Sequence, residues 1–384
     1  MSNSCPRDSL DYIFDNAFIR TWPDIEKYKD KIYLVYAGLH IEYNFHNRKI
    51  KFFVDEIKDA LASGKTKIIF AGEAEDFCLE VVDKIHRIID RVENLKPEDC
   101  TYISSGENVN TLYNEYCKKQ GYTNRINCLS LRHFESIFQR WAKSQKEIVE
   151  LSEYKIYPRE KTFLCFNKVH REHRIMLLDL IFKYDLLDKS FYSFQGEVVF
   201  GRPDVTWIDT VDKKYKYFLK NKDKFPLVLN ITKDRYNPTD ITPDDHKYFR
   251  KSYFSVITET VYFENHKLDS SVFFSEKIWK PIVMNHPFIL VARHKMLAKL
   301  KDLGYKTFHP FINESYDDIR DPKERMIAIV EEIKRLSELS EDDMLEWQKG
   351  IKPIVEYNRQ TFFEKTKFSD VDSVDHLFRP SRLP

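Results

Sequence analysis

Residues 162–194 read TFLCFNKVHREHRIMLLDLIFKYDLLDKSFYSF and decide the fold. The apolar run 162–166 predicts a buried strand, and the polar turn 167–172 separates it from a helical pattern over 173–187. Residues 191–194 then predict a second strand. A strand, a crossover helix and a second strand in this order form a βαβ unit, whose two strands run parallel. The segment therefore predicts an α/β fold built on a parallel sheet.

The same alternation continues on both sides of this unit. Further helices are predicted at 77–92 and 295–303, and Asp321, Pro322 and Glu324 form a strong helix start. Alternating strands and helices argue for parallel sheets with helices on both faces. Further strands are predicted at 31–38, 66–70, 101–106, 253–257 and 287–292.

The length of 384 residues favours two domains, because a single core seldom grows that large. The polar segment 151–161 contains a proline and interrupts the alternation, so we expect a domain boundary there. The expected parts are an N-terminal Rossmann-like domain at 1–150, a second Rossmann-like domain at 151–345, and a helical segment at 346–384. We expect the last segment to cross back to the first domain.

Composition excludes several classes of protein. The 62 Lys and Arg residues nearly balance the 61 Asp and Glu residues, so no strong global field favours nucleic acid or an anionic membrane. No apolar run approaches the roughly 20 residues that span a bilayer, and the N-terminus lacks the pattern of a signal peptide. The six cysteines show no CxxC pair. We expect reduced thiols, a cytoplasmic protein and no membrane partner.

The segment SEKIWKPI at 275–282 predicts a helix start that can bind an anion. Ser275 is a good N-cap residue, and the free amides and positive dipole of a helix start favour anions. A diphosphate would gain those amides and the ammonium of Lys277, and Glu276 would accept hydrogen bonds from a ribose diol. An ordinary capped and charged helix start explains the same residues, and both interpretations stay open at this point.

A second basic segment, NKVHREHR at 167–174, follows the strand of the opening βαβ unit. Open α/β sheets bind ligands at the carboxyl ends of their strands. Arg171 and Arg174 are three residues apart and would lie on one side of the first helical turn. Two guanidinium groups there would take up the charge that develops on a diphosphate leaving group. A solvated basic loop is the alternative. Helix starts usually prefer acids, so a basic helix start is easier to explain if it faces an anion.

The segment FFSEKIWKPIVMNHPFILV at 273–291 resembles a signature of the α1,3-fucosyltransferase family. It is still more similar to phage-type and bacterial glycosyltransferases, in which an SEK-KPI-PFI block precedes an L-LG-KTF segment. The resemblance covers residues 253–325. This chain continues with Leu300, Leu303, Gly304, Lys306, Thr307 and Phe308, and then with Tyr316, Asp317 and Arg325.

The resemblance implies a GT-B glycosyltransferase, with two Rossmann-like doubly wound domains facing a cleft. Such an enzyme moves a sugar from a nucleotide-diphosphate donor, UDP- or GDP-linked, to an acceptor hydroxyl, and we expect inversion. It implies that Glu276 binds the ribose, that Lys277 binds the diphosphate, and that Glu259 is a second pocket residue. Asn167, Arg171 and Arg174 complete the expected donor site, which lies in the domain at 151–345. Pro281 departs from the fucosyltransferase signature and predicts a short or kinked helix.

No metal and no other cofactor are expected. No DxD motif flanked by apolar residues is present, and the pairs Asp244–Asp245 and Asp317–Asp318 fit helix caps or solvated turns, because Asp bonds local amides at such positions.

The acceptor side is expected in the domain at 1–150. An inverting transfer needs a general base, and His40 and Glu73 follow predicted strands where they would face a cleft. Capping or plain exposure explains either residue equally simply. The expected acceptor is a saccharide or a modified DNA base such as a hydroxymethylated pyrimidine. If the protein is encoded by a phage, we expect it to act in the cytoplasm of the host cell. Near-neutral charge argues against DNA. A non-catalytic protein that binds nucleotide sugars or partners is the alternative of another class.

Overall fold

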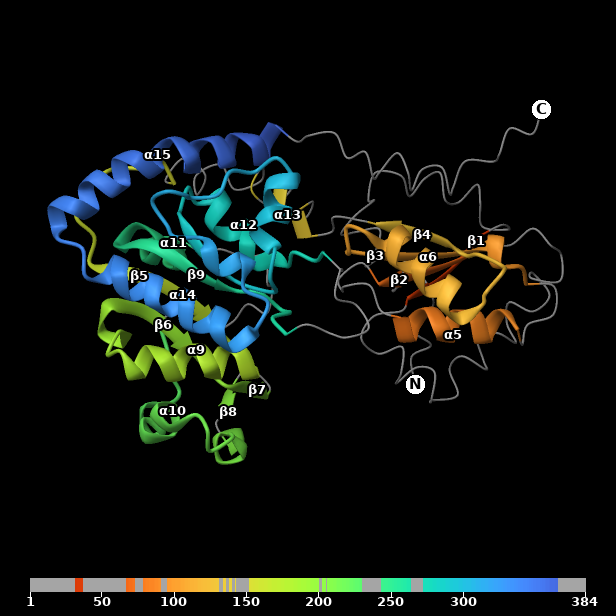
Figure 1. Cartoon of the computed structure of the whole chain (residues 1–384), viewed down its shortest axis with the longest axis horizontal. Coiled ribbons are helices and arrows are strands. Elements are labelled where there is room, and N and C mark those ends of the chain that lie inside the picture. Colours follow the sequence, from red (N-terminus) through yellow and green to blue (C-terminus); the bar gives the residue numbers. More distant parts are fainter. Residues whose placement is uncertain are drawn as a thin grey trace. The chain divides into compact units, whose positions relative to one another are not determined.

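The computed structural model describes residues 32–36, 67–72, 79–90, 95–130, 134–135, 138–139, 142, 152–199, 202–204, 206–229, 243–263 and 272–364. The chain divides into two compact units, each built around a parallel four-stranded sheet (Figure 1). This confirms the predicted α/β class. The first unit contains Met1–Ile137, Asn265–Phe274 and Lys367–Pro384, and the second contains Phe138–Glu264 and Ser275–Thr366.

The sheet of the second unit has the order β10-β9-β5-β6, and all its neighbouring strands are parallel. The chain runs from β5 outward to β6 and then returns to place β9 on the opposite side of β5. Strand order therefore reverses between β5 and β9, and doubly wound sheets bind ligands at the carboxyl ends of the strands at such a reversal. The strands are β5 (Lys161–Asn167), β6 (Ser190–Phe194), β9 (Ser252–Thr258) and β10 (Phe288–Val291).

Helices cover both faces of this sheet. Figure 1 shows α9 and α14 on one side of it and α11, α12 and α15 on the other. Strands β9 and β10 are buried almost throughout, as expected for parallel strands that are covered twice. The helices are α9 (Glu172–Lys183), α10 (Lys216–Lys220), α11 (Pro243–Lys251), α12 (Glu276–Val283), α13 (Met296–Asp302), α14 (Pro322–Ser337) and α15 (Glu341–Glu364).

Short elements connect the strands of the second unit. Phe194 and Leu227 form an isolated antiparallel bridge. The connecting elements are the antiparallel pair β7 (Glu197–Val199) and β8 (Arg202–Asp204) and the 3-10 turns η3 (Leu187–Lys189), η4 (Thr206–Thr210), η5 (Lys222–Lys224) and η6 (Ser315–Asp318).

Carboxylates cap two helices of the second unit. The predicted start of α14 is confirmed, because Asp321 accepts hydrogen bonds from the backbone N–H groups of Lys323 and Glu324. Asp317 caps α13 from a distance in sequence, since its carboxylate accepts from the N–H groups of Leu297 and Ala298 at 3.0 and 3.1 Å. The predicted capping role of Asp317 is therefore confirmed.

The described strands of the first unit follow chain order, β1-β2-β3-β4, and run parallel. Gly121 ends α6 in the left-handed conformation, with φ of 74°. Strand β4 was not predicted. The predicted base candidates His40 and Glu73 lie outside the described residues. The elements are β1 (Ile32–Tyr36), β2 (Lys67–Gly72), α5 (Leu79–Ile89), η2 (Pro97–Asp99), β3 (Cys100–Ser104), α6 (Val109–Gln120) and β4 (Asn127–Ser130).

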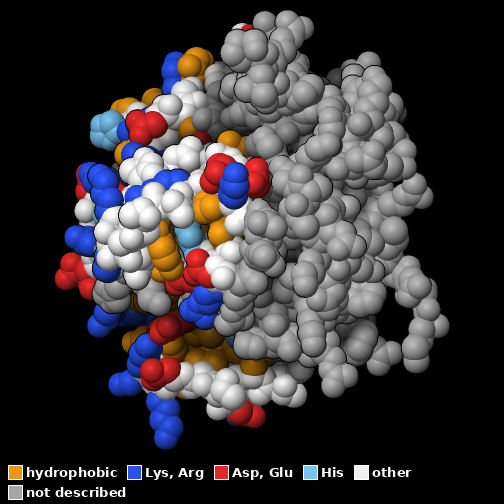
Figure 2. All heavy atoms as spheres, turned by 90° about the vertical axis from the view of Figure 1, so that its right-hand side faces the viewer, with side chains coloured by type: hydrophobic (Ala, Val, Ile, Leu, Met, Phe, Trp, Pro, Cys, Tyr) orange, Lys and Arg blue, Asp and Glu red, His pale blue; other side chains and the backbone are white. Residues whose placement is uncertain are grey.

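The described surface carries mixed charge. On the face shown in Figure 2, basic and acidic side chains of the described residues are interspersed, in keeping with the near-neutral net charge. Within the described ranges, no helix combines the length and the apolar character needed to cross a bilayer.

Candidate functional site

The candidate site of the second unit lies where β5 and β9 end, at the reversal of strand order. Asn167 ends β5 and Thr258 ends β9. The Thr258 hydroxyl donates to Asn167 Oδ1 at 2.5 Å, and Asn167 Nδ2 lies 3.4 Å from the hydroxyl of Tyr192 on β6. Asn167 is 2% exposed. Its side chain therefore links the ends of β5 and β9 to the neighbouring strand β6.

Two arginines reach the end of β9 from the start of α9. Arg171 Nη1 donates to the carbonyl of Thr260 at 2.8 Å, while Arg174 donates to the carbonyls of Val169 at 2.8 Å and Thr258 at 3.5 Å. Arg171 is exposed and Arg174 is buried. Burial, followed by the charge of Arg171, lowers the pKa of Arg174 to about 10. Arg174 remains cationic at neutral pH but is buried, whereas Arg171 is open to solvent.

The pKa of His173 reflects the burial and the charges of the site. Its ring Nε2 lies 3.1 Å from the carbonyl of Glu259, and because a carbonyl only accepts, Nε2 carries the proton. Burial, and then the charges of Arg174, Arg171 and Lys277, lower the pKa of His173 to about 3. Three cations thus act on one neutral ring.

The carboxyl group of Glu259 lies beneath the start of α12. Its Oε2 accepts from the backbone N–H of Ser275 at 3.2 Å, from the Ser275 hydroxyl, and from the N–H of Thr260 at 3.3 Å. Oε1 is buried and has no partner among the described residues. Burial raises the pKa of Glu259 and outweighs the opposing charge of Lys277. Glu259 therefore supports the helix start from inside the protein.

Helix α12 begins as predicted. Ser275 is the N-cap, its hydroxyl accepts from the N–H of Lys277 at 3.4 Å, and Pro281 lies inside this eight-residue helix. Lys277 Nζ donates to Glu276 Oε1 at 2.6 Å. Burial would raise the pKa of Glu276, but the charges of Lys277 and Lys280 and the Lys277 hydrogen bond bring it below its ordinary value. Glu276 and Lys277 form a largely buried ion pair, with side chains 15% and 23% exposed.

Arg171 and Lys277 meet at one residue, Thr260. Arg171 donates to its carbonyl, and Lys277 Nζ donates to its hydroxyl at 3.3 Å. A guanidinium and an ammonium from two helix starts therefore lie within reach of one ligand. Such a pair of cations, next to the first amides of α12, can bind the oxygen atoms of phosphate groups.

The structure brings the six expected donor residues to the ends of β5 and β9 and the starts of α9 and α12. Only Arg171, Glu276 and Lys277 have accessible side chains. Thr258, Thr260 and His173 also belong to this cluster and were not predicted as site residues. Their signal in the sequence was position, because two threonines flank Glu259 directly after a predicted strand and His173 lies inside the basic segment.

No protein-family model matches the chain, and no curated protein matches it in sequence. The N-terminal domain of Candida albicans trehalose-6-phosphate phosphatase is similar with 10% identity and a TM-score of 0.42, over 98% of this chain and 77% of that chain. An α,α-trehalose-phosphate synthase (UDP-forming) from Burkholderia vietnamiensis is similar with 10% identity and a TM-score of 0.37, over 90% of this chain and 70% of that chain. An α,α-trehalose 6-phosphate synthase from Burkholderia multivorans is similar with 9% identity and a TM-score of 0.40, over 100% of this chain and 79% of that chain. Likeness at this level carries no information on activity.

Proposed function

We propose that the protein is a glycosyltransferase of the GT-B kind. It moves a sugar from a UDP- or GDP-linked donor to an acceptor hydroxyl, with inversion and without a metal ion. One observation carries this proposal: Arg171 and Lys277 converge on Thr260 at the point where strand order reverses. A diphosphate at that point neutralises Arg171 and Lys277. Among the residues that the structure describes, the only ion pair of either cation is the one between Lys277 and Glu276.

Arg171 and Lys277 hold the diphosphate and take up the charge that grows on it as the sugar leaves. A guanidinium binds two phosphate oxygens at once, and an ammonium adds a compact charge beside it. Both groups are held in place by hydrogen bonds to Thr260. This preorganisation stabilises the charge of the transition state at little cost in reorganisation.

Glu276 accepts hydrogen bonds from the ribose hydroxyls of the donor. Its lowered pKa keeps it ionised, and an ionised carboxylate offers acceptors only. Its carboxylate is paired with Lys277. When the diphosphate binds Lys277, the carboxylate is free to turn toward the ribose.

Asn167, Arg174 and Glu259 act on the donor through other residues. Asn167 joins the strand ends, Arg174 holds the turn before α9, and Glu259 supports Ser275. All three are buried. Their role is to hold Arg171 and the start of α12 in the geometry that a diphosphate requires.

The acceptor hydroxyl is deprotonated by a general base from the first domain, and His40 and Glu73 are the candidates. A saccharide is the acceptor that the mixed surface charge fits best, because duplex DNA draws on a basic footprint.

Release of nucleotide from a panel of UDP-, GDP- and CMP-sugars, without acceptor, tests this function. We expect slow hydrolysis of one UDP- or GDP-sugar and none of the CMP-sugars, which contain a single phosphate. Lys277→Ala should abolish the release, and Lys299→Ala, which removes an exposed lysine from α13, should not. Binding of a donor without release would indicate a non-catalytic nucleotide-sugar-binding protein.

A further inference from the structure

Thr260 is the residue at which the two proposed diphosphate cations meet, and most of its hydrogen-bonding groups are used inside the protein. Its carbonyl accepts from Arg171 Nη1 at 2.8 Å, and its backbone N–H donates to Glu259 Oε2 at 3.3 Å. Its hydroxyl oxygen accepts from Lys277 Nζ at 3.3 Å. Among the residues that the structure describes, only the hydroxyl proton of Thr260 has no acceptor.

The hydroxyl proton of Thr260 is directed away from Lys277. An ammonium group only donates, and a hydroxyl has a single proton. Oγ1 therefore accepts from Lys277 through a lone pair and keeps its own proton for another acceptor. Thr260 is partly exposed, so that acceptor can belong to a ligand.

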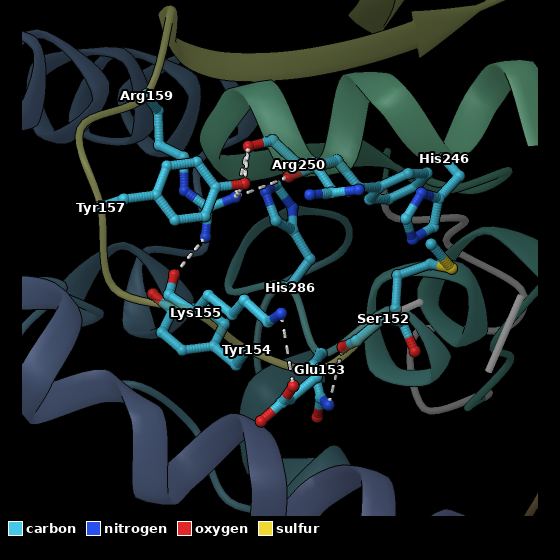
Figure 3. A pocket seen from close by; sticks show the side chains of 12 residues that line it. Ser152, Glu153, Tyr154, Lys155, Tyr157, Arg159, His246, Arg250 and His286 are labelled. Carbon is cyan, nitrogen blue, oxygen red and sulfur yellow. Dashed lines mark hydrogen bonds and ion pairs between the residues drawn. The ribbon is translucent and has the colours of Figure 1, made fainter. Parts of the chain in front are cut away.

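Arg171 also keeps donors for a ligand. Only its Nη1 has a partner among the described residues, and the residue is exposed. Arg159, at the amino end of the same sheet, differs, because its Nη1 donates to the Tyr157 hydroxyl at 3.0 Å, its Nη2 to the carbonyl of Lys155 at 2.8 Å and its Nε to Gln348 Oε1 at 3.4 Å (Figure 3). The guanidinium of Arg159 is therefore occupied by the protein, whereas that of Arg171 can bind an anion.

Lys277 has no spare donor. Its three N–H groups serve three acceptors, which are Glu276 Oε1 at 2.6 Å, Ser275 Oγ at 3.2 Å and Thr260 Oγ1 at 3.3 Å. A phosphate oxygen that binds Lys277 must therefore replace one of them. The proposed release of Glu276 toward the ribose supplies that place, and Thr260 then remains beside the ammonium.

We propose that the Thr260 hydroxyl binds phosphate in the donor site and donates its proton to an oxygen of the diphosphate. This inference rests on the proposed function. The phosphate that takes the place of Glu276 on Lys277 presents a second oxygen to the hydroxyl, while Arg171 binds from the carbonyl side of the same residue. A fixed hydroxyl donor adds direction to the attraction of the two cations, as preorganised donors do at other sites of developing charge.

The alternative role for Thr260 is to position Lys277 and nothing more. Thr260→Val keeps the shape of the side chain, but it removes the acceptor for Lys277 together with the donor to phosphate. A double-mutant cycle with Lys277→Ala separates the two roles, because that variant has no ammonium left to position.

Calorimetric titration of the full chain with UDP, GDP and inorganic pyrophosphate tests the inference. Thr260→Val should weaken the binding of whichever nucleotide the wild type binds by about tenfold, because a hydrogen bond to a charged group is lost. Thr260→Ser should keep most of the affinity. In the Lys277→Ala background, Thr260→Val should weaken binding further, by about fivefold or more. Pyrophosphate has no ribose and no base, and Thr260→Val alone should weaken its binding by a similar factor.

Thr210→Val is the matched control, because it removes the hydroxyl of an exposed threonine in η4. This variant should bind the nucleotide as the wild type does. Thermal unfolding of each variant without ligand checks that the fold is intact.

Three results would overturn the inference. If Thr260→Val has no effect in the Lys277→Ala background, Thr260 only positions Lys277, and the proposed function stands without the inference. A loss with the nucleotide but none with pyrophosphate would place the hydroxyl at the ribose. If the wild type binds neither UDP nor GDP, the proposed function fails and the inference fails with it.

Discussion

The buried carboxylate of Glu259 accepts a hydrogen bond from the backbone N–H of Ser275 at 3.2 Å. This contact joins the end of β9 to the N-cap of α12, across sixteen positions of the sequence. The Ser275 hydroxyl bonds the same oxygen and also accepts from the N–H of Lys277. The position of Glu276 and Lys277 at the end of the sheet therefore depends on a residue that no ligand needs to touch.

Glu259→Ala should destabilise the protein by about 2 kcal/mol, because the N–H and hydroxyl of Ser275 lose their acceptor inside the protein. Glu259→Gln keeps an acceptor oxygen and should cost less than half as much. Urea unfolding measures both, with Glu338→Ala at an exposed position as the control. If Ala and Gln have the same effect, the contact with Ser275 is not what stabilises this region.

Arg171→Ala should weaken the binding of UDP or GDP by about tenfold or more, since a charge-assisted bidentate contact is lost. Arg171→Lys should recover only part of the affinity, because an ammonium lacks the planar pair of donors. Lys183→Ala removes a cation from the other end of α9 and should leave affinity unchanged. Equal losses in Arg171→Ala and Lys183→Ala would point to general charge rather than to a site.

Two buried histidines should make stability fall in acid. Burial is the largest cause that lowers the pKa of His173 and of His286, each from 6.5 to about 3. Below pH 6.5 the unfolded chain binds protons that the folded chain does not, so stability is complete above 6.5 and is lost as the pH falls toward 3. The expected slope is about 1 kcal/mol per pH unit for each histidine.

Urea unfolding between pH 7 and pH 4, in wild type and His286→Gln, measures this slope. Glutamine can accept from Ser255 and donate to the Ser252 carbonyl, so the fold should persist. The variant should lose about half of the two-histidine contribution. An unchanged slope would show that His286 is not neutral in the folded protein.

Arg325 should be one of the most sensitive positions in the second unit. It is 1% exposed, and its guanidinium donates to the carbonyls of Ala292, Ile319, Arg320 and Tyr262. Arg325→Met should cost about 3 kcal/mol or more, because these buried carbonyls lose a charged donor. Lys323→Met, at an exposed site in the same turn, should change stability by less than about 0.5 kcal/mol. Similar unfolding midpoints for the two variants would contradict this role.

Strands with continuous apolar runs could be predicted from the sequence, and those with mixed composition could not. The run before Asn167 and the run at 287–292 were recognised because parallel strands are buried on both faces. Strand β4, Asn127–Ser130, was missed because it is short and half polar. Helix α11 was also missed, since its PDDHKYFRK sequence has few apolar residues and resembles a solvated turn.

The residues of the site could be predicted from the sequence, but which of them are buried could not. Arg171 and Arg174 were placed on one side of a helical turn, and both do reach the end of β9. Spacing alone does not tell which of them β9 covers, and Arg174 is the buried one. Glu259 was expected in the pocket, yet its carboxylate holds Ser275, a contact that depends on strand order and has no local signal.

The binding of UDP and GDP to wild type and Lys277→Ala, followed by calorimetry, tests the central claim most directly. Lys277 Nζ contacts Glu276 and Thr260 at the proposed diphosphate position. We expect one of the two nucleotides to bind the wild type and to bind Lys277→Ala at least about tenfold more weakly, while Lys299→Ala keeps the affinity of the wild type. Lys277→Ala should still unfold cooperatively, at a lower thermal midpoint because the buried Glu276 loses its partner. Equal affinity of wild type and Lys277→Ala for that nucleotide, or no binding of either nucleotide to the wild type, would contradict the account.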